Sequence, residues 1–207
     1  LPGQVHLLDG FGSQALWTSE APDVVFQMVR TTLEGEGAAA SNELLVQLNP
    51  ELADAIVGCK ATKVEIPTFD DDPATNQTRK LHAFLLEPKT PVAKEGQLAL
   101  VRSFYGGDNE YNTYDHILCA AGLTVLSPAV RGSSGFGKEF YGLNDKDLGG
   151  DEIVDLFYAA RWLEERTGLP SERIGVYGRS HGGYATMRAM TFPPETNGRN
   201  ESYAVGF

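Results

Sequence analysis

The stretch that decides the fold is Arg-Ile-Gly-Val-Tyr-Gly-Arg-Ser-His-Gly-Gly-Tyr, residues 173–184. A short apolar run typical of a buried strand leads into the pattern Gly-x-Ser-x-Gly, and the residues that follow have helical character. A serine on such a sharp strand-to-helix turn projects its hydroxyl above the sheet, where it can act as a nucleophile. Side chains at positions 178 and 182 would collide with neighbouring backbone, which explains the two glycines. Ser180 is therefore the candidate nucleophile, with Gly178 and Gly182 as the glycines of the turn; a glycine-rich turn with a capping serine is the alternative.

The residues before this stretch alternate between strand-like and helix-like segments. Strands are predicted at 98–101, 123–126 and 173–177, and helices at 114–121, 151–166 and 181–190. The clearest helix is 151–166, whose apolar residues recur at helical spacing. Alternation of this kind predicts the α/β class, with a mainly parallel sheet and helices on both of its faces.

Two glycine-containing loops follow the first two strands of this parallel set. Phe104–Asp108 comes directly after the first strand, where its backbone could approach a reacting group; a plain turn is the alternative. Arg131–Gly137 follows the second strand with glycines in the order G-x-x-G-x-G, the reverse of a dinucleotide fingerprint. We interpret the second loop as structural, and we expect no cofactor and no metal.

The histidines leave the candidate nucleophile without a base. In hydrolases with this turn, the acid and then the histidine follow the serine along the chain, and no histidine follows His181 here. His181 itself adjoins Ser180, so its side chain should leave the turn on another face, while its backbone N–H is well placed to bind an oxyanion. The chain is thus expected to hold the nucleophile but not its base.

The first part of the chain has a different character. Residues 1–48 contain four short apolar runs separated by turns, which predicts an antiparallel meander of the size of one β-propeller blade, or else a free-standing pair of hairpins. Residues 63–69 and 81–86 predict two more strands, the first of them at a sheet edge because of Pro67. Asp70–Pro73 is interpreted as a solvated turn, since the glycine and glutamate of a calcium loop are missing. The predicted domains are 1–48 and 49–207.

Composition excludes several classes of protein. The 207 residues are 42% hydrophobic and 22% charged, as in globular proteins, and the net charge of −11 disfavours a nucleic-acid partner. No apolar run approaches the length of a membrane span, so no membrane partner is expected. The two cysteines and the absence of C-x-x-C predict neither a disulfide framework nor a zinc site, and they favour a reduced compartment, hence a cytoplasmic localisation.

Three segments together resemble the prolyl oligopeptidase family of serine peptidases, whose members join a β-propeller to an α/β-hydrolase domain. These are Tyr105–Gly107, Arg131–Gly137 and Arg173–Tyr184, and the segment 47–50 is similar to the family's exit from its propeller. The resemblance implies that Ser180 is the acylated nucleophile and that the Tyr105 hydroxyl and the His181 N–H bind the oxyanion. It also implies the N-terminal half of an α/β-hydrolase domain preceded by the last propeller blade.

The expected function is therefore hydrolysis of short peptides through an acyl-enzyme on Ser180. An esterase or lactonase on the same fold, or a non-catalytic scaffold, are the alternatives. The chain starts with Leu1 rather than Met and ends in a strand-like run, so both ends are interpreted as cut. The catalytic Asp and His are expected beyond Phe207, and the chain alone is expected to be inactive. Its expected partners are the rest of its own polypeptide and, as a homo-oligomer, further copies.

Overall fold

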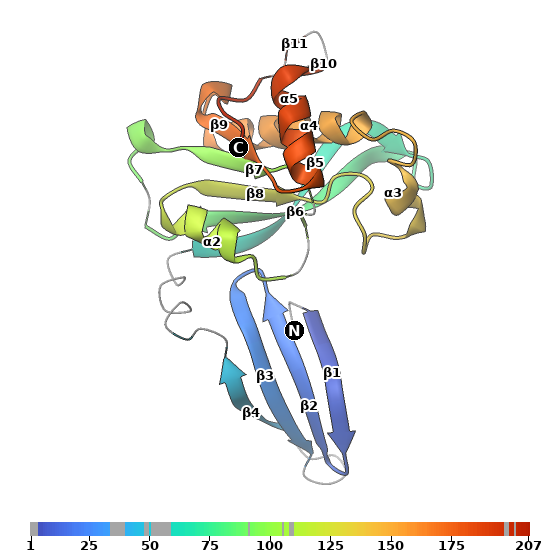
Figure 1. Cartoon of the computed structure of the whole chain (residues 1–207), viewed down its shortest axis with the longest axis vertical. Helices are drawn as coiled ribbons and strands as arrows, with labels where there is room; N and C mark the ends of the chain where they lie inside the picture. The colour runs from blue at the N-terminus through green and yellow to red at the C-terminus, as the bar shows by residue number, and fades with distance from the viewer. Residues whose placement is uncertain are drawn as a thin grey trace.

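The computed structural model describes residues 4–33, 40–47, 50, 59–90, 92–104, 106–107, 110–196, 199–200 and 202–207. These residues form two main sheets, one built from the first part of the chain and one from the rest (Figure 1). The predicted boundary at residues 48 and 49 falls outside the described residues, so the division into domains stays a prediction.

The first sheet is the predicted antiparallel meander. Its strands are β1 Gln4–Phe11, β2 Gln14–Ala21, β3 Val24–Leu33 and β4 Ala40–Gln47, hydrogen-bonded in that order. Ala21, Val25 and Val29 are buried, whereas the apolar side chains of β1 and β4 are largely exposed. A sheet of this kind stabilises itself poorly unless a further layer covers it, as happens to each blade of a propeller.

The second sheet has five strands in the order β5-β6-β8-β7-β9. They are β5 Cys59–Asp72, β6 Gln77–Pro88, β7 Ala99–Arg102, β8 Thr124–Pro128 and β9 Ile174–Tyr177. β6 runs antiparallel to β5 and β8, while β7 is parallel to β8 and β9. β5 lies at the edge, as Pro67 predicts, but it continues through Asp70–Asp72, so the turn falls at residues 73–76 instead of 70–73.

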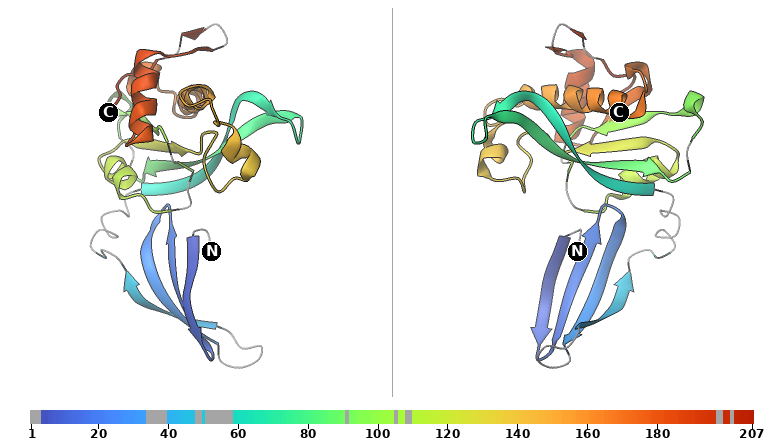
Figure 2. Two further views of the ribbon diagram at one scale, coloured as in Figure 1. Left: turned by 45° about the vertical axis from the view of Figure 1, so that its right-hand side comes forward. Right: turned by 180° about the vertical axis from the view of Figure 1, so that it is seen from behind.

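Helices cover both faces of this sheet, as the α/β alternation predicts (Figure 2). The main helices are α2 Thr113–Ala120, α4 Asp151–Thr167 and α5 His181–Thr191. Side chains of α4 and α5 join one buried cluster with Val101 and Val176, and Cys119 of α2 joins the opposite cluster with Leu100 and Tyr177. Adjacent strand residues thus face opposite layers, which the alternation of side chains along a strand requires.

The remaining elements are short, and the sequence did not predict them. They are the one-turn helices η1 Lys94–Gly96, α3 Lys138–Gly142 and η2 Ser171–Arg173, and the two-residue strands β10 Glu195–Thr196 and β11 Arg199–Asn200. Among the described residues, none of the helices combines the length and the apolar character that crossing a bilayer requires.

The last described residues extend the sheet beyond β9. The N–H of Val176 donates to the Val205 carbonyl at 2.9 Å, and the N–H of Gly178 donates to the Phe207 carbonyl at 3.1 Å. Val176 and Gly206 form a parallel bridge. The strand-like run at 202–207 is thereby confirmed as extended chain next to β9.

A disulfide joins the two cysteines, which corrects the prediction made from their small number. Cys59 at the start of β5 and Cys119 in α2 are both buried, and their sulfur atoms are bonded across a separation of 60 residues. Sequence spacing could not reveal this pair, because only the fold brings the edge strand and the helix together. Disulfides persist mainly in oxidising compartments, so this bond removes the ground for favouring a reduced one; the cytoplasmic localisation stays an untested prediction.

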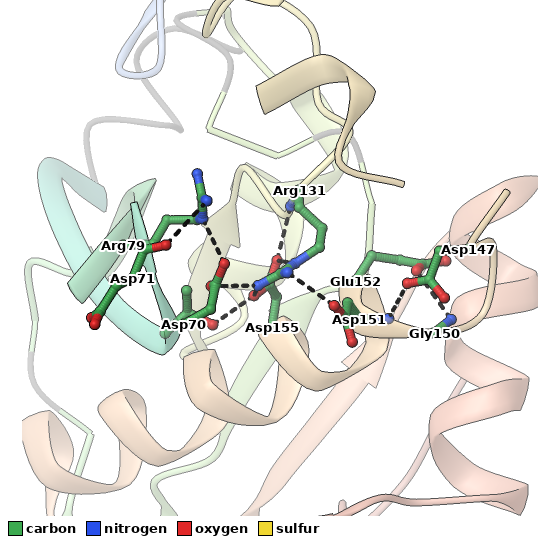
Figure 3. A network of polar contacts seen from close by, with 10 residues as sticks. Asp70, Asp71, Arg79, Arg131, Asp147, Gly150, Asp151, Glu152 and Asp155 are labelled. Carbon is green, nitrogen blue, oxygen red and sulfur yellow. Dashed lines mark hydrogen bonds and ion pairs between the residues drawn. The ribbon is translucent and has the colours of Figure 1, made fainter. Parts of the chain in front are cut away.

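A buried arginine fixes the loop at 131–137 to the rest of the domain (Figure 3). The Arg131 guanidinium donates to both carboxylate oxygens of Asp155 in α4, each at 2.9 Å, and to Asp70 of β5 at 2.9 Å. It also contacts Asp151 at 3.2 Å and lies over the ring of Phe69. The cation therefore has structural partners on two elements, in agreement with a structural loop.

The two sheets meet where the turn between β2 and β3 contacts α2. His116, which is 1% exposed, places its Nε2 2.5 Å from the carbonyl oxygen of Pro22. The ring of Tyr111 stacks on the imidazole with a centroid distance of 4.6 Å. The side chain of Gln4 donates to Glu110 at 2.8 Å, which adds a second contact between the two parts.

Candidate active site

Ser180 occupies a strained turn at the carboxyl end of β9. Its φ of 57° and ψ of −119° lie in a region that residues with side chains rarely adopt. The residue is exposed and stands immediately before the first residue of α5. A serine held in this way presents its hydroxyl to solvent at the edge of the sheet, which is the geometry that the Gly-x-Ser-x-Gly pattern predicts.

The two glycines of the turn are closely packed, Gly178 much more tightly than Gly182. A Cβ on Gly178 would lie 2.0 Å from Oγ of Ser103 and 2.7 Å from the carbonyl carbon of Gly182. A Cβ on Gly182 would lie 3.0 Å from the same Ser103 Oγ and 3.4 Å from Cβ of Phe104. A side chain at position 178 would therefore force the turn to open, whereas one at position 182 would require Ser103 and Phe104 to shift by a few tenths of an ångström.

Ser103 is a structural residue of the turn that sequence reasoning missed. It is fully buried at the end of β7, and its hydroxyl donates to the Gly182 carbonyl at 2.7 Å. Thr186 of α5 in turn donates to Ser103 Oγ at 3.2 Å. On the other side of the turn, the Ser103 N–H donates to the Tyr177 carbonyl at 2.8 Å, so Ser103 connects β7 to both β9 and α5. A small polar residue at the end of an apolar strand was the only signal in the sequence.

The predicted oxyanion donors are described only in part. The backbone N–H of His181 belongs to the first residue of α5, and among the described residues it has no backbone hydrogen bond. Tyr105 lies outside the described residues, and so does Asp108 in the same loop. The glycines between them are described: a Cβ on Gly106 would lie 2.4 Å from the Pro128 carbonyl, and the Gly107 N–H donates to Ser127 at 2.8 Å. Gly106 and Gly107 therefore lie tightly against the end of β8.

The side chain of His181 turns to the α4 side of the turn. Its ring centroid lies 4.2 Å from that of Phe104, and its Nε2 lies 3.9 Å from a carboxylate oxygen of Glu152. Glu152 is fully buried and accepts hydrogen bonds from the N–H groups of Gly149 and Gly150. Nε2 is itself buried with no hydrogen-bond partner among the described residues. The sequence did not predict a role for Glu152.

None of the four histidines is placed as a base for Ser180. His116 contacts the meander, His82 stacks on Phe136, and His6 bonds to Gln4 on β1. His181 faces Glu152 and makes no hydrogen bond to the serine hydroxyl. Within the residues that the structure describes, the candidate nucleophile thus has no histidine partner.

A pocket of about 610 Å³ opens next to Ser180 on the α2 side of the sheet. Its wall includes Arg102, Asn112, Tyr114, Asp115 and Arg179. Asp115 is buried; its carboxylate accepts from the Tyr177 hydroxyl at 2.7 Å and from Arg102 at 3.4 Å. Burial raises the pKa of Asp115 and outweighs the opposite effects of Arg102 and Tyr177. The pKa of Tyr177 is also raised, by burial and by the neighbouring Asp115.

No metal site accompanies this pocket in the part of the chain that the structure describes. Nowhere among those residues do three or more His, Cys, Asp or Glu side chains gather in a way that could hold an ion. Asp70, in the acidic run at 70–72, pairs with both Arg79 and Arg131.

Comparison with known proteins confirms the resemblance found in the sequence. Residues 109–196 match the sequence profile described as "Prolyl oligopeptidase family". Dipeptidyl aminopeptidase BIII of Pseudoxanthomonas mexicana is 29% identical over 140 residues, which are 63% of this chain and 20% of that protein. The acylamino-acid-releasing enzyme of Rattus norvegicus is 28% identical over 119 residues, or 55% of this chain and 16% of that enzyme. The chain therefore spans about a fifth of the length of these relatives or less.

Solved structures confirm the fold. A puromycin hydrolase superimposes with a TM-score of 0.71 and 18% identity over 95% of this chain and 28% of its own. The acylaminoacyl peptidase of Pyrococcus horikoshii gives a TM-score of 0.68 and 17% identity over 92% of this chain and 30% of its own. At such identities the likeness concerns the fold alone, and it covers both sheets of this chain.

Proposed function

We propose that this chain, whose residues 109–196 belong to the prolyl oligopeptidase family, is the nucleophile-bearing part of a serine peptidase acting on short peptides. The observation that carries the proposal is the backbone of Ser180, with φ 57° and ψ −119°, between β9 and the start of α5. Strain of this kind costs about 1–3 kcal/mol and is typically found at functional sites. A capping serine alone would not need it, and Ser180 makes no side-chain cap to its helix.

The proposed reaction begins with attack of Ser180 Oγ on the carbonyl carbon of the scissile peptide bond. The hydroxyl proton passes to a histidine, the carbonyl oxygen becomes an oxyanion, and the C–N bond then breaks as that proton is delivered to the leaving amine. Water hydrolyses the resulting ester and frees the serine. The N–H of His181 and the hydroxyl of Tyr105 bind the oxyanion in this proposal; loss of one such donor typically slows catalysis by about 10²–10³-fold.

The proposal assigns the missing groups to the rest of the polypeptide. The histidine and the aspartate that orients it follow Phe207, in the order that this fold uses. The β1–β4 meander is the last blade of a propeller that restricts access to short peptides. The 207 residues alone are therefore inactive, and the complete polypeptide is the form to assay.

A fluorophosphonate probe tests the proposal directly, because it labels an activated serine without a matched substrate. The complete polypeptide should be labelled, Ser180→Ala should not, and Ser171→Ala, a serine in η2, should behave like the wild type. Peptide anilides and short acyl esters are then compared. Labelling of Ser180→Ala equal to wild type would refute the assignment, and turnover of esters without any turnover of peptides would favour an esterase.

A further inference from the structure

The pocket beside Ser180 is cationic although the protein is acidic. The chain has a net charge of −11, yet the described wall of this pocket includes two arginines, Arg102 and Arg179, and one acidic side chain, Asp115. Arg179 is exposed and directly precedes the nucleophile. The Arg102 side chain is 22% exposed at the end of β7. The local charge therefore differs in sign from that of the molecule.

Both oxygens of the Asp115 carboxylate, the one acidic side chain in the described wall, already accept a hydrogen bond from the protein. One oxygen of Asp115 accepts from Tyr177 and the other from Arg102, and its side chain is only 4% exposed. A carboxylate that is so buried and already bonded to two protein donors is poorly available to a cationic ligand.

Three side chains of the described wall, those of Arg102, Asn112 and Arg179, have hydrogen-bond donors to spare. Arg102 gives one N–H to Asp115, and a guanidinium has five. The carbonyl oxygen of the Asn112 side chain accepts the Asp115 N–H at 3.0 Å, which leaves its NH₂ group for the pocket. Arg179 has no ion-pair partner among the described residues. An environment of donors and positive charge, partly shielded from solvent, binds an anion.

We propose that this pocket recognises a carboxylate on the substrate, so that the enzyme prefers peptides with a negative charge next to the scissile bond. The inference rests on the proposed function, because it places the carboxylate beside the carbonyl that Ser180 attacks. Two parts of a short peptide can supply this group: an acidic side chain on the residue that acylates Ser180, or the free C-terminus of a short leaving peptide. Planar carboxylates match the forked donors of arginine.

The test uses two matched pairs of peptides and the complete polypeptide. The first pair carries Glu or Gln at the residue that supplies the scissile carbonyl, with both C-termini amidated. The second pair is one neutral peptide with a free or an amidated C-terminus. We expect kcat/KM to favour the charged member of at least one pair by about tenfold, the effect of one charge-assisted hydrogen bond. The pair that shows the preference identifies the source of the carboxylate.

Variants then locate the effect. Arg179→Gln should reduce the charge preference to about twofold or less, and added salt should weaken it in the wild type. The double variant Arg102→Gln/Asp115→Asn removes the second cation without leaving a buried charge unpaired. Arg166→Gln, an exposed arginine near the end of α4, should keep the full preference.

The outcomes separate the inference from the proposed function. If neutral and charged peptides are hydrolysed equally well, or if the preference survives in both the Arg179 and the Arg102/Asp115 variants, the inference is overturned and the peptidase assignment stands. If no peptide is hydrolysed and the fluorophosphonate fails to label Ser180, both are overturned.

Discussion

Replacing Arg131 with methionine should destabilise the α/β part of the molecule strongly. Arg131 is 3% exposed and its main partner Asp155 is fully buried. In the variant, the Asp155 carboxylate still accepts hydrogen bonds from the backbone N–H of residue 131 at 2.9 Å and from the Thr68 hydroxyl at 2.6 Å. It loses the positive charge that balances its own. Removing one partner of a buried ion pair costs about 3–5 kcal/mol.

This cost can be converted into a melting temperature. In a domain of this size, about 1 kcal/mol shifts Tm by roughly 2–4 °C, so Arg131→Met should melt about 6–20 °C lower. The other two aspartates add little, because Asp151 is half exposed and Asp70 keeps its contact with Arg79. Differential scanning calorimetry of the complete polypeptide, following the transition that contains this domain, measures the shift.

Two further variants separate charge from packing. Arg131→Met/Asp155→Asn removes the unpaired charge as well, so it should recover a substantial part of the lost Tm. Arg166→Met breaks an exposed pair with Glu87 at 3.4 Å, and such pairs contribute about 0–1 kcal/mol. If Arg131→Met melts within about 2 °C of the wild type, the network in Figure 3 does not stabilise the fold as we argue.

Three other changes test the remaining features. Gly178→Ala, whose Cβ would meet Ser103 Oγ at 2.0 Å and the Gly182 backbone at 2.7 Å, should cut the rate of fluorophosphonate labelling by at least about 10²-fold; normal labelling would show that the turn adapts. Cys59→Ser/Cys119→Ser should lose about 2–4 kcal/mol of stability, and the wild type should lose Tm when a reductant is added while the variant does not. Burial lowers the pKa of His116 below its ordinary 6.5, because the buried imidazole is held in its neutral form. The contribution of neutral His116 to the stability of the fold is therefore present above pH 6.5 and is lost as the pH falls below 6.5. Between about pH 7.5 and about pH 5, the wild type should therefore lose more Tm than His116→Gln, and equal losses would contradict the burial argument.

The parallel part of the fold could be predicted from the sequence because its elements carry local signals. The helix predicted at 151–166 is α4 at 151–167, which the apolar spacing and Gly168 determine locally. The strand predicted at 63–69 is much longer, at 59–72, because pairing with β6 extends it into residues whose composition is typical of a turn. Cross-strand pairing is non-local, so short-range propensity underestimates such strands.

The residues of the site also differ in whether the sequence encodes them locally or through contacts between distant segments. The turn around Ser180 is encoded within a few consecutive residues, and its backbone has the geometry expected from them. Ser103, Glu152 and the Cys59–Cys119 bond depend on contacts between residues that are far apart in the chain, and no pattern within one segment could identify them. The roles of Ser180, His181 and Tyr105 remain predictions, which the probe and variant experiments address.

Ser103 also has a consequence for redesign of the turn around Ser180. Its hydroxyl contacts the Gly182 carbonyl and Thr186, and it occupies the space that a side chain at Gly178 would need. In a library that varies the Gly-x-Ser-x-Gly segment alone, most variants should therefore lose the geometry of the turn, because Ser103 at the end of β7 stays in contact with it. Productive diversity has to come from varying positions 103, 178, 182 and 186 jointly, as one four-residue unit.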